Sequence, residues 1–382
     1  METVTFVFAG GGSGGHLFPG LAIGEQLREL MGERAELLFL CSDRAVDRDV
    51  LTPEGVRFEA LAAKPLGIRP RALWRFLKGW GPSVRKTRKM LREAKRHGPV
   101  HLIAMGGFVA APAVQAARVE RVPSTIVNLD AVPGKANRLI ARRVTGGAGA
   151  YTVVACKDYP KWQVVPPIVR KAAVNTLPRD ACRAALGIDA RQPVLMVTGG
   201  SQGSATINRL VMDIASHPSR SLAGWHILHQ CGAPKVGGRG PSREELVEAY
   251  RAAGVAATVE PLVRTMGLWW GAAELAVSSA GAGAVAEAWC NRTPTVFLPY
   301  PYHADQHQKL NAAALVRASA AVITTDHIDA SKNMTESAPV ILRLLASADE
   351  RGRLRSALDR LGPADGARRI AEGLSARHRP GQ

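Results

Sequence analysis

VTFVFAGGGSGGHLFPG, residues 4–20, joins an apolar, β-rich run to a glycine-rich turn that ends at His16. A helical pattern with Pro19 near its start follows as far as Leu30. Such a turn lets backbone N–H groups converge at a helix N-terminus, where the helix dipole favours an anion. The stretch therefore predicts a strand, an anion-binding loop and a helix, which is how a Rossmann-like domain begins.

A second stretch of the same kind, VLMVTGGSQGS at residues 194–204, lies about half a chain later. The two copies together predict an α/β protein with two Rossmann-like, doubly wound parallel-sheet domains that face each other across a ligand cleft. In both halves apolar strands alternate with helical patterns, which is typical of a parallel sheet covered on both faces. The expected strands are residues 4–9, 37–41, 100–105 and 123–128 in the first half and 194–198, 225–230, 257–259, 275–278, 295–298 and 321–324 in the second.

The chain length of 382 residues is long for a single hydrophobic core. The alternation breaks around residues 163–174, where VVPPIVR reads as an interdomain linker. We therefore expect an N-terminal domain at residues 1–165 and a C-terminal domain at residues 166–345. Residues 346–382 are expected to form a C-terminal helix that packs back toward the first domain and ends in a frayed tail.

The formal charge of +18 indicates an anionic partner: nucleic acid, an acidic bilayer or a phosphorylated substrate. The five cysteines are scattered and form no CxxC pair, which points to a reducing compartment and no structural zinc. No run approaches the roughly 18 apolar residues of a membrane span, and the N-terminus has no basic region typical of a signal peptide. Any membrane contact is therefore expected to be peripheral.

His16 closes the first loop at the mouth of the predicted sheet, beside backbone donors. It could take a proton from an acceptor hydroxyl, or its ring N–H could simply cap the loop. Gly10-x-Gly12-x-x-Gly15 also fits a dinucleotide fingerprint, with Asp43 placed as a ribose-binding acid, which makes an NAD-dependent dehydrogenase an alternative. That alternative uses neither the second loop nor His16. No P-loop lysine follows either loop, which argues against an ATPase.

Glu287 lies in a helical pattern that follows a strand and a small-residue turn at residues 279–286. A carboxylate there can accept both hydroxyls of a ribose while the turn amides face phosphate, although it could equally be a solvated helix residue. The amide- and imidazole-rich residues 303–311 suit recognition of sugar hydroxyls. His303 and His307 have no evident third ligand, so we expect no metal site.

Residues 64–96 carry twelve Lys or Arg against the single acid Glu93. Basic side chains with aromatic and aliphatic anchors are typical of an interfacial membrane patch. An amphipathic helix with its tryptophans in the core is the alternative, and no nucleic-acid module accompanies the stretch. The anchors expected to touch the membrane are Leu73, Trp74, Phe76, Leu77 and Trp80.

Together these motifs resemble the MurG family of GT-B glycosyltransferases, which adds N-acetylglucosamine to undecaprenyl-diphospho-muramoyl-pentapeptide. The resemblance spans nearly the whole chain. It rests on GGSGGHLFPGLAIGEQL at 11–27, GGFVAAP at 106–112, VPGKANRLIARR at 132–143, IVR at 168–170, GGSQGSATIN at 199–208, HQCG at 229–232, AGAGAVAEA at 280–288 and HADQHQKLNAA at 303–313.

The resemblance implies a GT-B fold, with an acceptor- and membrane-facing first domain and a second domain that binds UDP-N-acetylglucosamine. It implies inverting transfer to the 4-hydroxyl of lipid I, giving lipid II, without a cofactor or metal and at the cytoplasmic face of the cell membrane. The implied partners are the two substrates and anionic lipids, with no nucleic acid. His16, assisted by Asp130, is the implied base, and the implied donor-binding residues are Ser13, Gly14, Gly15, Arg170, Ser201, Gln202, Val263, Ala282, Gly283, Ala284, Val285, Glu287, Gln308 and Asn311.

The chain departs from the family pattern at four positions. Asn128 stands where the family usually has a glutamate, Ser279 replaces a common arginine and Ala284 a common threonine. Pro167-Ile168 replaces the Asn-Pro that usually precedes Val-Arg. A transferase acting on another lipid acceptor, such as diacylglycerol, and a catalytically silent UDP-sugar- or lipid-binding relative are therefore kept as alternatives.

Overall fold

The structure is a computed structural model that describes residues 2–12, 14–67, 69–141, 149–200, 202–217, 221–233, 240–302 and 305–378. The chain divides into two compact units. Unit 1 comprises Met1–Arg170 with Asp365–Gln382, and unit 2 comprises Lys171–Ala364. The units therefore change at 170/171 and 364/365, whereas the sequence places the changes at 165/166 and 345/346.

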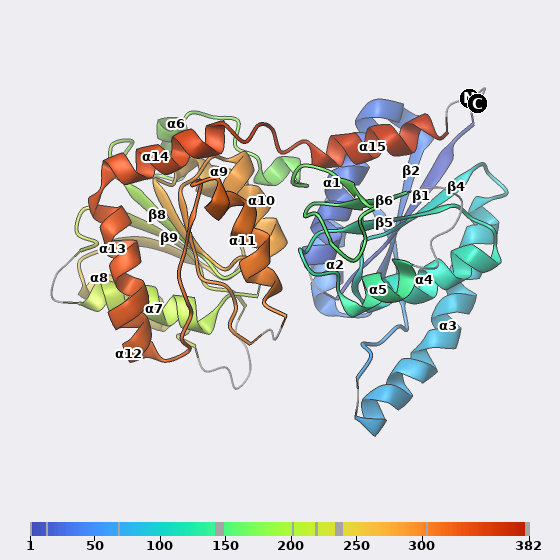
Figure 1. Cartoon of the computed structure of the whole chain (residues 1–382), viewed down its shortest axis with the longest axis horizontal. Helices are drawn as coiled ribbons and strands as arrows, with labels where there is room; N and C mark the ends of the chain where they lie inside the picture. The colour runs from blue at the N-terminus through green and yellow to red at the C-terminus, as the bar shows by residue number, and fades with distance from the viewer. Residues whose placement is uncertain are drawn as a thin grey trace. The chain divides into compact units, whose positions relative to one another are not determined.

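Unit 1 is built on a parallel sheet with the strand order β3-β2-β1-β4-β5-β6-β7 (Figure 1). At its centre Val7 pairs with Leu38 on one side and with Leu102 on the other. The strands are β1 (Val4–Ala9), β2 (Ala35–Ser42), β3 (Arg57–Leu61), β4 (Val100–Ala104), β5 (Ser124–Asn128), β6 (Ala150–Thr152) and β7 (Gln163–Val164), and the helices are α1 (Gly14–Met31), α2 (Ala45–Leu51), α3 (Pro70–Ala94), α4 (Gly107–Val119), α5 (Lys135–Ala141) and α15 (Gly366–Ala376).

Both faces of this sheet are covered, which is why its central strands are mainly apolar along their whole length. Phe6 and Phe8 of β1 pack with α1 and α15, whereas Val7 packs on the opposite face with α3 and α4. The predicted linker is partly wrong, because Gln163–Val164 adds the edge strand β7. Helix α1 begins at Gly14 rather than near Pro19. Glycine has a low helix propensity, so the sequence predicts a turn at Gly14 and Gly15, but these residues form the first turn of the helix.

Unit 2 has a second parallel sheet, with the order β10-β9-β8-β11-β12-β13. All six strands expected from the sequence are present, and no strand end is shifted by more than one residue. They are β8 (Val194–Thr198), β9 (His226–Gln230), β10 (Ala256–Glu260), β11 (Leu275–Ser278), β12 (Thr295–Phe297) and β13 (Val322–Ile323). The helices are α6 (Arg179–Ala185), α7 (Ala205–Ser216), α8 (Arg243–Ala252), α9 (Met266–Ala272), α10 (Ala282–Cys290), α11 (His307–Arg317), α12 (Ala330–Lys332), α13 (Ala338–Ala346) and α14 (Ala348–Asp359).

The last part of the chain is shared between the units. Helix α14 buries Ala357 and Leu358 in the core of unit 2, whereas α15 buries Ile370 and Leu374 in the core of unit 1. Beyond α15, His378 Nε2 lies 3.1 Å from Nδ1 of His101 in β4. The C-terminal region expected as one helix is therefore two helices, each belonging to a different unit.

Acid should destabilise both units, because each buries a histidine in its neutral form. Burial lowers the pKa of His101 in unit 1 and of His229 in unit 2 from 6.5 to about 3. The unfolded chain takes up these protons below pH 6.5 and the folded chain does not, so stability is lost as the pH falls. We expect each unit to lose about 2 kcal/mol between pH 7 and pH 5.

Urea unfolding at both pH values measures this loss. His229→Gln should flatten the pH dependence of unit 2, whereas the same change at the exposed His97 should leave it as in the wild type. Equal unfolding midpoints at pH 7 and pH 5 would contradict the prediction.

Candidate functional site

Each sheet has a central strand pair from which the chain winds in opposite directions. The pairs are β1 with β4 in unit 1 and β8 with β11 in unit 2. Ligands of doubly wound folds bind outside the carboxyl ends of such strands. The described parts of the predicted loops lie there: residues 10–12 and 14–16 follow β1, residues 106–107 follow β4, residues 199–200 and 202–204 follow β8 and residues 279–281 follow β11.

His16 lies in the first turn of α1 and its ring packs on the turn between β4 and α4. A Cβ atom on Gly107 would lie 3.0 Å from His16 Cδ2, and one on Gly106 would lie 3.3 Å from His16 Cε1. Both glycines have positive φ angles, +100° at Gly106 and +72° at Gly107. The turn therefore needs glycine to bring its backbone against the imidazole.

The environment of His16 favours the neutral imidazole. Burial lowers its pKa, and the Asp130 carboxylate opposes this most strongly. Its Nδ1 atom is buried and has no hydrogen-bond partner among the described residues, so this nitrogen does not cap the loop. A Cβ atom on Gly106 would lie 3.4 Å from Nδ1 and 3.1 Å from Asn137 Oδ1, another buried atom without a partner. A neutral imidazole in this place can accept a proton.

The side-chain amide of Asn128 is engaged in hydrogen bonds within unit 1. It therefore cannot replace the glutamate of the family pattern as a base. It is buried at the end of β5, and its Nδ2 donates to the Asp130 carbonyl at 2.7 Å and to Thr152 Oγ1 at 3.1 Å. Its Oδ1 accepts from Asn137 Nδ2 at 2.9 Å. Asn128 therefore fixes the loop at residues 128–130. The Asp130 carboxylate of that loop acts on His16 through its charge.

The carboxylate that holds the first glycine-rich loop is one that the sequence analysis missed. Asp43, the acid of the dehydrogenase alternative, forms an exposed ion pair with Lys64. Asp47, four residues later, is fully buried and accepts the Gly12 N–H. Asp47-Arg48-Asp49 is also an Asp-x-Asp sequence, but Asp49 is exposed while Asp47 is enclosed. Within the described ranges, no group of three or more His, Cys, Asp or Glu could hold a metal ion.

In unit 2 the second glycine-rich loop is fixed by close backbone packing. A Cβ atom on Gly203, whose φ is +67°, would lie 2.1 Å from the Cys231 carbonyl oxygen. Asn208 of α7 donates to that oxygen at 2.9 Å, and Ser204 is the N-cap of α7. Gln202 is exposed beside this packing. The predicted residues Ser13, Ser201 and His303 lie outside the described residues.

The third loop opens α10 at Gly281, which offers no side chain to cap the helix. The backbone N–H groups of the first turn have no acceptor one turn earlier, as at any helix start, which suits an anion. Ala282, Gly283, Ala284 and Val285 form this turn. Asn311 of α11 is buried and braces the turn by donating to the Ala280 carbonyl at 3.3 Å.

Glu287 lies one turn further along α10 and is partly buried. Its Oε2 accepts the indole N–H of the fully buried Trp270 at 2.8 Å. Of the other predicted donor residues, Gln308 accepts the Tyr300 N–H through its Oε1 at 2.8 Å, and Val263 packs partly buried against the core. The carboxylate is therefore held by a rigid partner beside the start of α10.

Arg170 belongs to unit 1, whereas its predicted partner Ser201 belongs to unit 2. Its Nη2 lies 2.7 Å from Glu54 Oε1, and its guanidinium carbon lies 5.0 Å from the ring centre of Phe18. Within unit 1 the side chain is therefore engaged by an acid and an aromatic ring.

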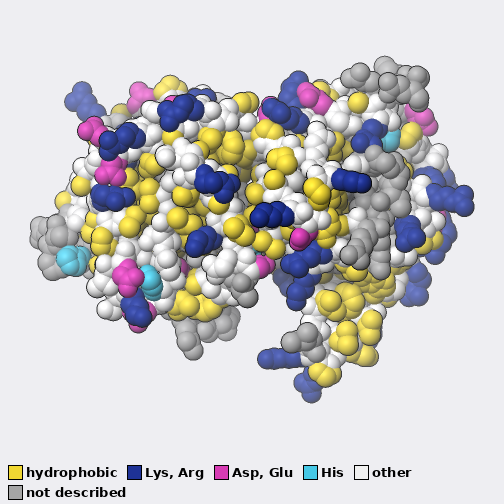
Figure 2. Space-filling view, in the orientation of Figure 1, with side chains coloured by type: hydrophobic (Ala, Val, Ile, Leu, Met, Phe, Trp, Pro, Cys, Tyr) yellow, Lys and Arg dark blue, Asp and Glu magenta, His cyan; other side chains and the backbone are white. Residues whose placement is uncertain are grey.

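Helix α3 carries the predicted membrane patch. Leu73, Trp74 and Leu77 are 43%, 60% and 61% exposed, whereas Phe76 and Trp80 are half-buried and contact each other with ring centres 5.4 Å apart. Figure 2 shows apolar side chains with Lys and Arg around them over this end of the helix, which projects beyond the rest of unit 1 in Figure 1. No helix among the described residues is long and apolar enough to cross a membrane.

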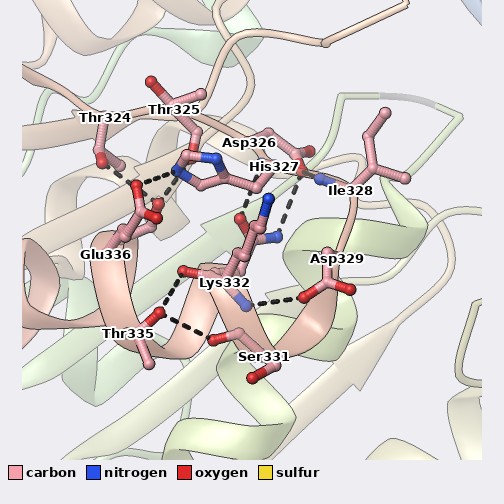
Figure 3. A network of polar contacts seen from close by, with 12 residues as sticks. Thr324, Thr325, Asp326, His327, Ile328, Asp329, Ser331, Lys332, Thr335 and Glu336 are labelled. Atoms are coloured by element: carbon pink, nitrogen blue, oxygen red, sulfur yellow. Dashed lines mark hydrogen bonds and ion pairs between the residues drawn. The ribbon is translucent and has the colours of Figure 1, made fainter.

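A polar network that the sequence analysis also missed supports the second loop from the segment after β13 (Figure 3). Asp326 is buried, and its Oδ1 accepts from the Ile328 N–H at 2.9 Å and from Asn333 Nδ2 at 3.2 Å. Its Oδ2 accepts the hydroxyl of Thr206, which lies 3.0 Å from the hydroxyl of the N-cap Ser204. This network fixes the start of α7.

Comparisons with known proteins agree with this architecture. The sequence model of the Glycosyltransferase family 28 N-terminal domain matches residues 6–148, and that of the C-terminal domain matches residues 194–337. A crystal structure of Acinetobacter baumannii MurG aligns with a TM-score of 0.67 at 21% identity over 98% of this chain and all of that one. A Polygonum tinctorium UDP-glucosyltransferase aligns with a TM-score of 0.66 at 14% identity over 98% of each chain. The two doubly wound units have the GT-B fold of glycosyltransferases, as predicted.

Sequence relatives narrow the class to a family. A Clavibacter michiganensis UDP-N-acetylglucosamine–N-acetylmuramyl-(pentapeptide) pyrophosphoryl-undecaprenol N-acetylglucosamine transferase is 32% identical over 96% of this chain and 95% of its own length. An Anaeromyxobacter dehalogenans transferase of the same name is 28% identical over 95% of this chain and 90% of its own. The chain belongs to this family of transferases, the MurG family, which confirms the predicted resemblance.

Proposed function

We propose that this protein transfers N-acetylglucosamine from UDP-N-acetylglucosamine to the 4-hydroxyl of undecaprenyl-diphosphate-linked muramoyl-pentapeptide, lipid I, to give lipid II for peptidoglycan synthesis. One observation carries the proposal: similarity to transferases named for these substrates extends over 96% of the chain at 32% identity. The chemistry of the residues at both strand switch points is compatible with such a transfer.

His16 is the proposed base. The acceptor oxygen attacks the anomeric carbon, the bond from that carbon to the UDP oxygen breaks, and the configuration inverts. A neutral His16 takes the hydroxyl proton as the new bond forms, and Asp130 stabilises the imidazolium. This role is supported by burial, which lowers the pKa of His16 and keeps the ring unprotonated near neutral pH.

The donor is proposed to bind mainly to unit 2. The first turn of α10 and the loop at residues 199–204 would face the diphosphate, where N–H groups stabilise the charge of departing UDP. Glu287 would accept the ribose hydroxyls, Val263 would face the uracil, and Gln308 and Asn311 would contact the sugar. Arg170, Ser13, Gly14 and Gly15 would approach the diphosphate from unit 1. We expect no metal requirement, so that a chelator leaves the rate unchanged.

The acceptor carries a polyprenyl chain, so the protein must work at a bilayer surface. We propose that α3 makes a peripheral contact with the anionic cytoplasmic leaflet. The support is the exposure of Leu73, Trp74 and Leu77 beside a row of basic residues, since apolar area and positive charge together give interfacial binding.

Removing the apolar part of this patch should release the protein from membranes. We expect the variant Leu73→Ser, Trp74→Ser, Leu77→Ser to bind vesicles containing one third phosphatidylglycerol about 100-fold more weakly, because about 3 kcal/mol of apolar transfer is lost. Sedimentation with vesicles measures the binding. The matched control is Leu139→Ser with Val119→Ser, which removes exposed apolar side chains elsewhere in unit 1. Equal binding by patch variant and wild type would contradict the contact.

The function itself is tested with radiolabelled UDP-N-acetylglucosamine and purified acceptors. Labelled lipid II formed from lipid I is the expected product. Transfer to diacylglycerol instead would favour the alternative acceptor. Binding of UDP-N-acetylglucosamine without transfer to either acceptor would favour a silent relative, which the departures at Asn128, Ser279 and Ala284 leave as the second candidate.

A further inference from the structure

The first glycine-rich loop already holds an anion, and that anion is a side chain of the protein. Asp47, in the first turn of α2, is fully buried. Its two oxygens accept the Gly12 N–H at 2.9 and 3.0 Å. Its Oδ2 also accepts the N–H and the hydroxyl of Ser42, each at 2.7 Å. The Gly12 N–H, which the sequence suggests for a phosphate, is therefore bound internally.

Gly12 is also contacted by the side chains of Arg44 and Phe108. Arg44 Nη1 donates to the Gly12 carbonyl at 2.9 Å, and the Arg44 guanidinium carbon lies 5.3 Å from the ring centre of Phe108. A Cβ atom on Gly12 would lie 2.6 Å from Phe108 Cε1, and the φ angle there is +88°. Gly12 is thus fixed between the end of β2, the start of α2 and the start of α4.

This fixed point lies four residues before His16. The ring of His16 contacts Gly106 and Gly107, which directly precede Phe108. Gly12 and His16 therefore both contact residues of the same turn, Gly12 at Phe108 and His16 at Gly106 and Gly107. A general base must come within about 3 Å of the proton that it takes, and an error of about 1 Å can cost about 100-fold in rate.

We propose that Asp47 is a positioning residue for the transfer, which fixes the loop that carries His16 and leaves the Gly12 N–H unavailable to substrate phosphate. The inference rests on the proposed function, in which His16 is the base. Asp47 also acts through its charge. Its carboxylate raises the pKa of His16, and the Asp130 carboxylate raises it more strongly. Both effects oppose the lowering of this pKa by burial.

The test compares Asp47→Asn with Asp49→Asn, which makes the same charge change at an exposed position of the same helix. An asparagine keeps the shape but points an amide at donors that need an acceptor. We expect Asp47→Asn to lower kcat about tenfold, with the KM for UDP-N-acetylglucosamine unchanged. The acid limb of its kcat/KM profile should move to lower pH, because the lost charge lowers the pKa of His16. Asp49→Asn should change neither. Wild-type kcat with an unmoved acid limb in Asp47→Asn would overturn the proposal.

An NMR titration of the His16 ring separates this proposal from the proposed function. The signal is assigned by its loss in His16→Gln, and Asp47→Asn should titrate at lower pH than the wild type. If the wild type transfers no sugar to lipid I, the proposed function fails, and an unchanged His16 titration in Asp47→Asn would independently overturn the role of Asp47.

Ser42→Ala replaces Asp47→Asn as the test if Asp47→Asn is not properly folded, which a non-cooperative unfolding curve would show. Ser42→Ala removes one donor to the carboxylate and keeps its charge, so we expect about threefold lower kcat and an unmoved acid limb. Wild-type kcat in Ser42→Ala would count against the proposal.

Discussion

His16→Ala should lower kcat by about 10²–10⁴-fold, the contribution that a positioned general base makes to proton transfer. Its affinity for UDP should stay at the wild-type value, because the proposed nucleotide contacts of Glu287 and the start of α10 lie in unit 2. The loss should appear in kcat with saturating lipid I, since a base acts in the transition state rather than in ground-state binding. Single-turnover transfer of labelled sugar measures the step directly.

His97→Ala is the matched control, because His97 is an exposed histidine of the same unit. It should transfer sugar at the wild-type rate. His16→Gln adds a finer test, because glutamine fills the space beside Gly106 and Gly107 without a titratable group. If either His16 variant turned over like the wild type, Asp130 or another group would have to be the base.

The strands that could be predicted are those whose own residues form a recognisable apolar pattern in the sequence. Strands β1 and β8 are buried along their whole length, so they appear in the sequence as mainly apolar runs with a single threonine each. Strand β3 is mostly half-exposed, β6 has three residues and β7 has two, so none of them shows a period or a clear apolar run.

The same distinction applies to the site. His16 and Glu287 follow strand ends and small-residue turns, and the resemblance to a known family gave them roles. Asp47 and Asp326 could not be found in this way, because their partners lie 35 residues away at Gly12 and 120 residues away at Thr206. A buried carboxylate that braces a loop looks in the sequence like any helix or loop acid. Only the tertiary structure distinguishes Asp47 from the exposed Asp43 and Asp49.

Glu287→Ala should weaken UDP binding about 100-fold, because it removes the charged acceptor of the two hydrogen bonds proposed from the ribose hydroxyls. The variant also leaves the indole N–H of Trp270 without its acceptor, so its unfolding should be compared with the wild type. Glu287→Gln avoids that complication, because its amide oxygen can still accept from Trp270. We expect Glu287→Gln to bind UDP about tenfold more weakly than the wild type, since a neutral acceptor makes the weaker bond. Calorimetry with UDP measures both variants.

Binding of 2′-deoxy-UDP decides whether the lost affinity belongs to the ribose. The wild type should prefer UDP over 2′-deoxy-UDP, and Glu287→Gln should lose most of that preference, because the hydroxyl and its acceptor form one interaction. Glu244→Gln, the same change at an exposed position of α8 in unit 2, should keep both the affinity and the preference. If Glu287→Gln still discriminated between the two nucleotides as the wild type does, the carboxylate would serve Trp270 and α10 rather than the ribose. The nucleotide-binding role would then pass to the backbone of the α10 turn, whose N–H groups no side-chain substitution at position 287 removes.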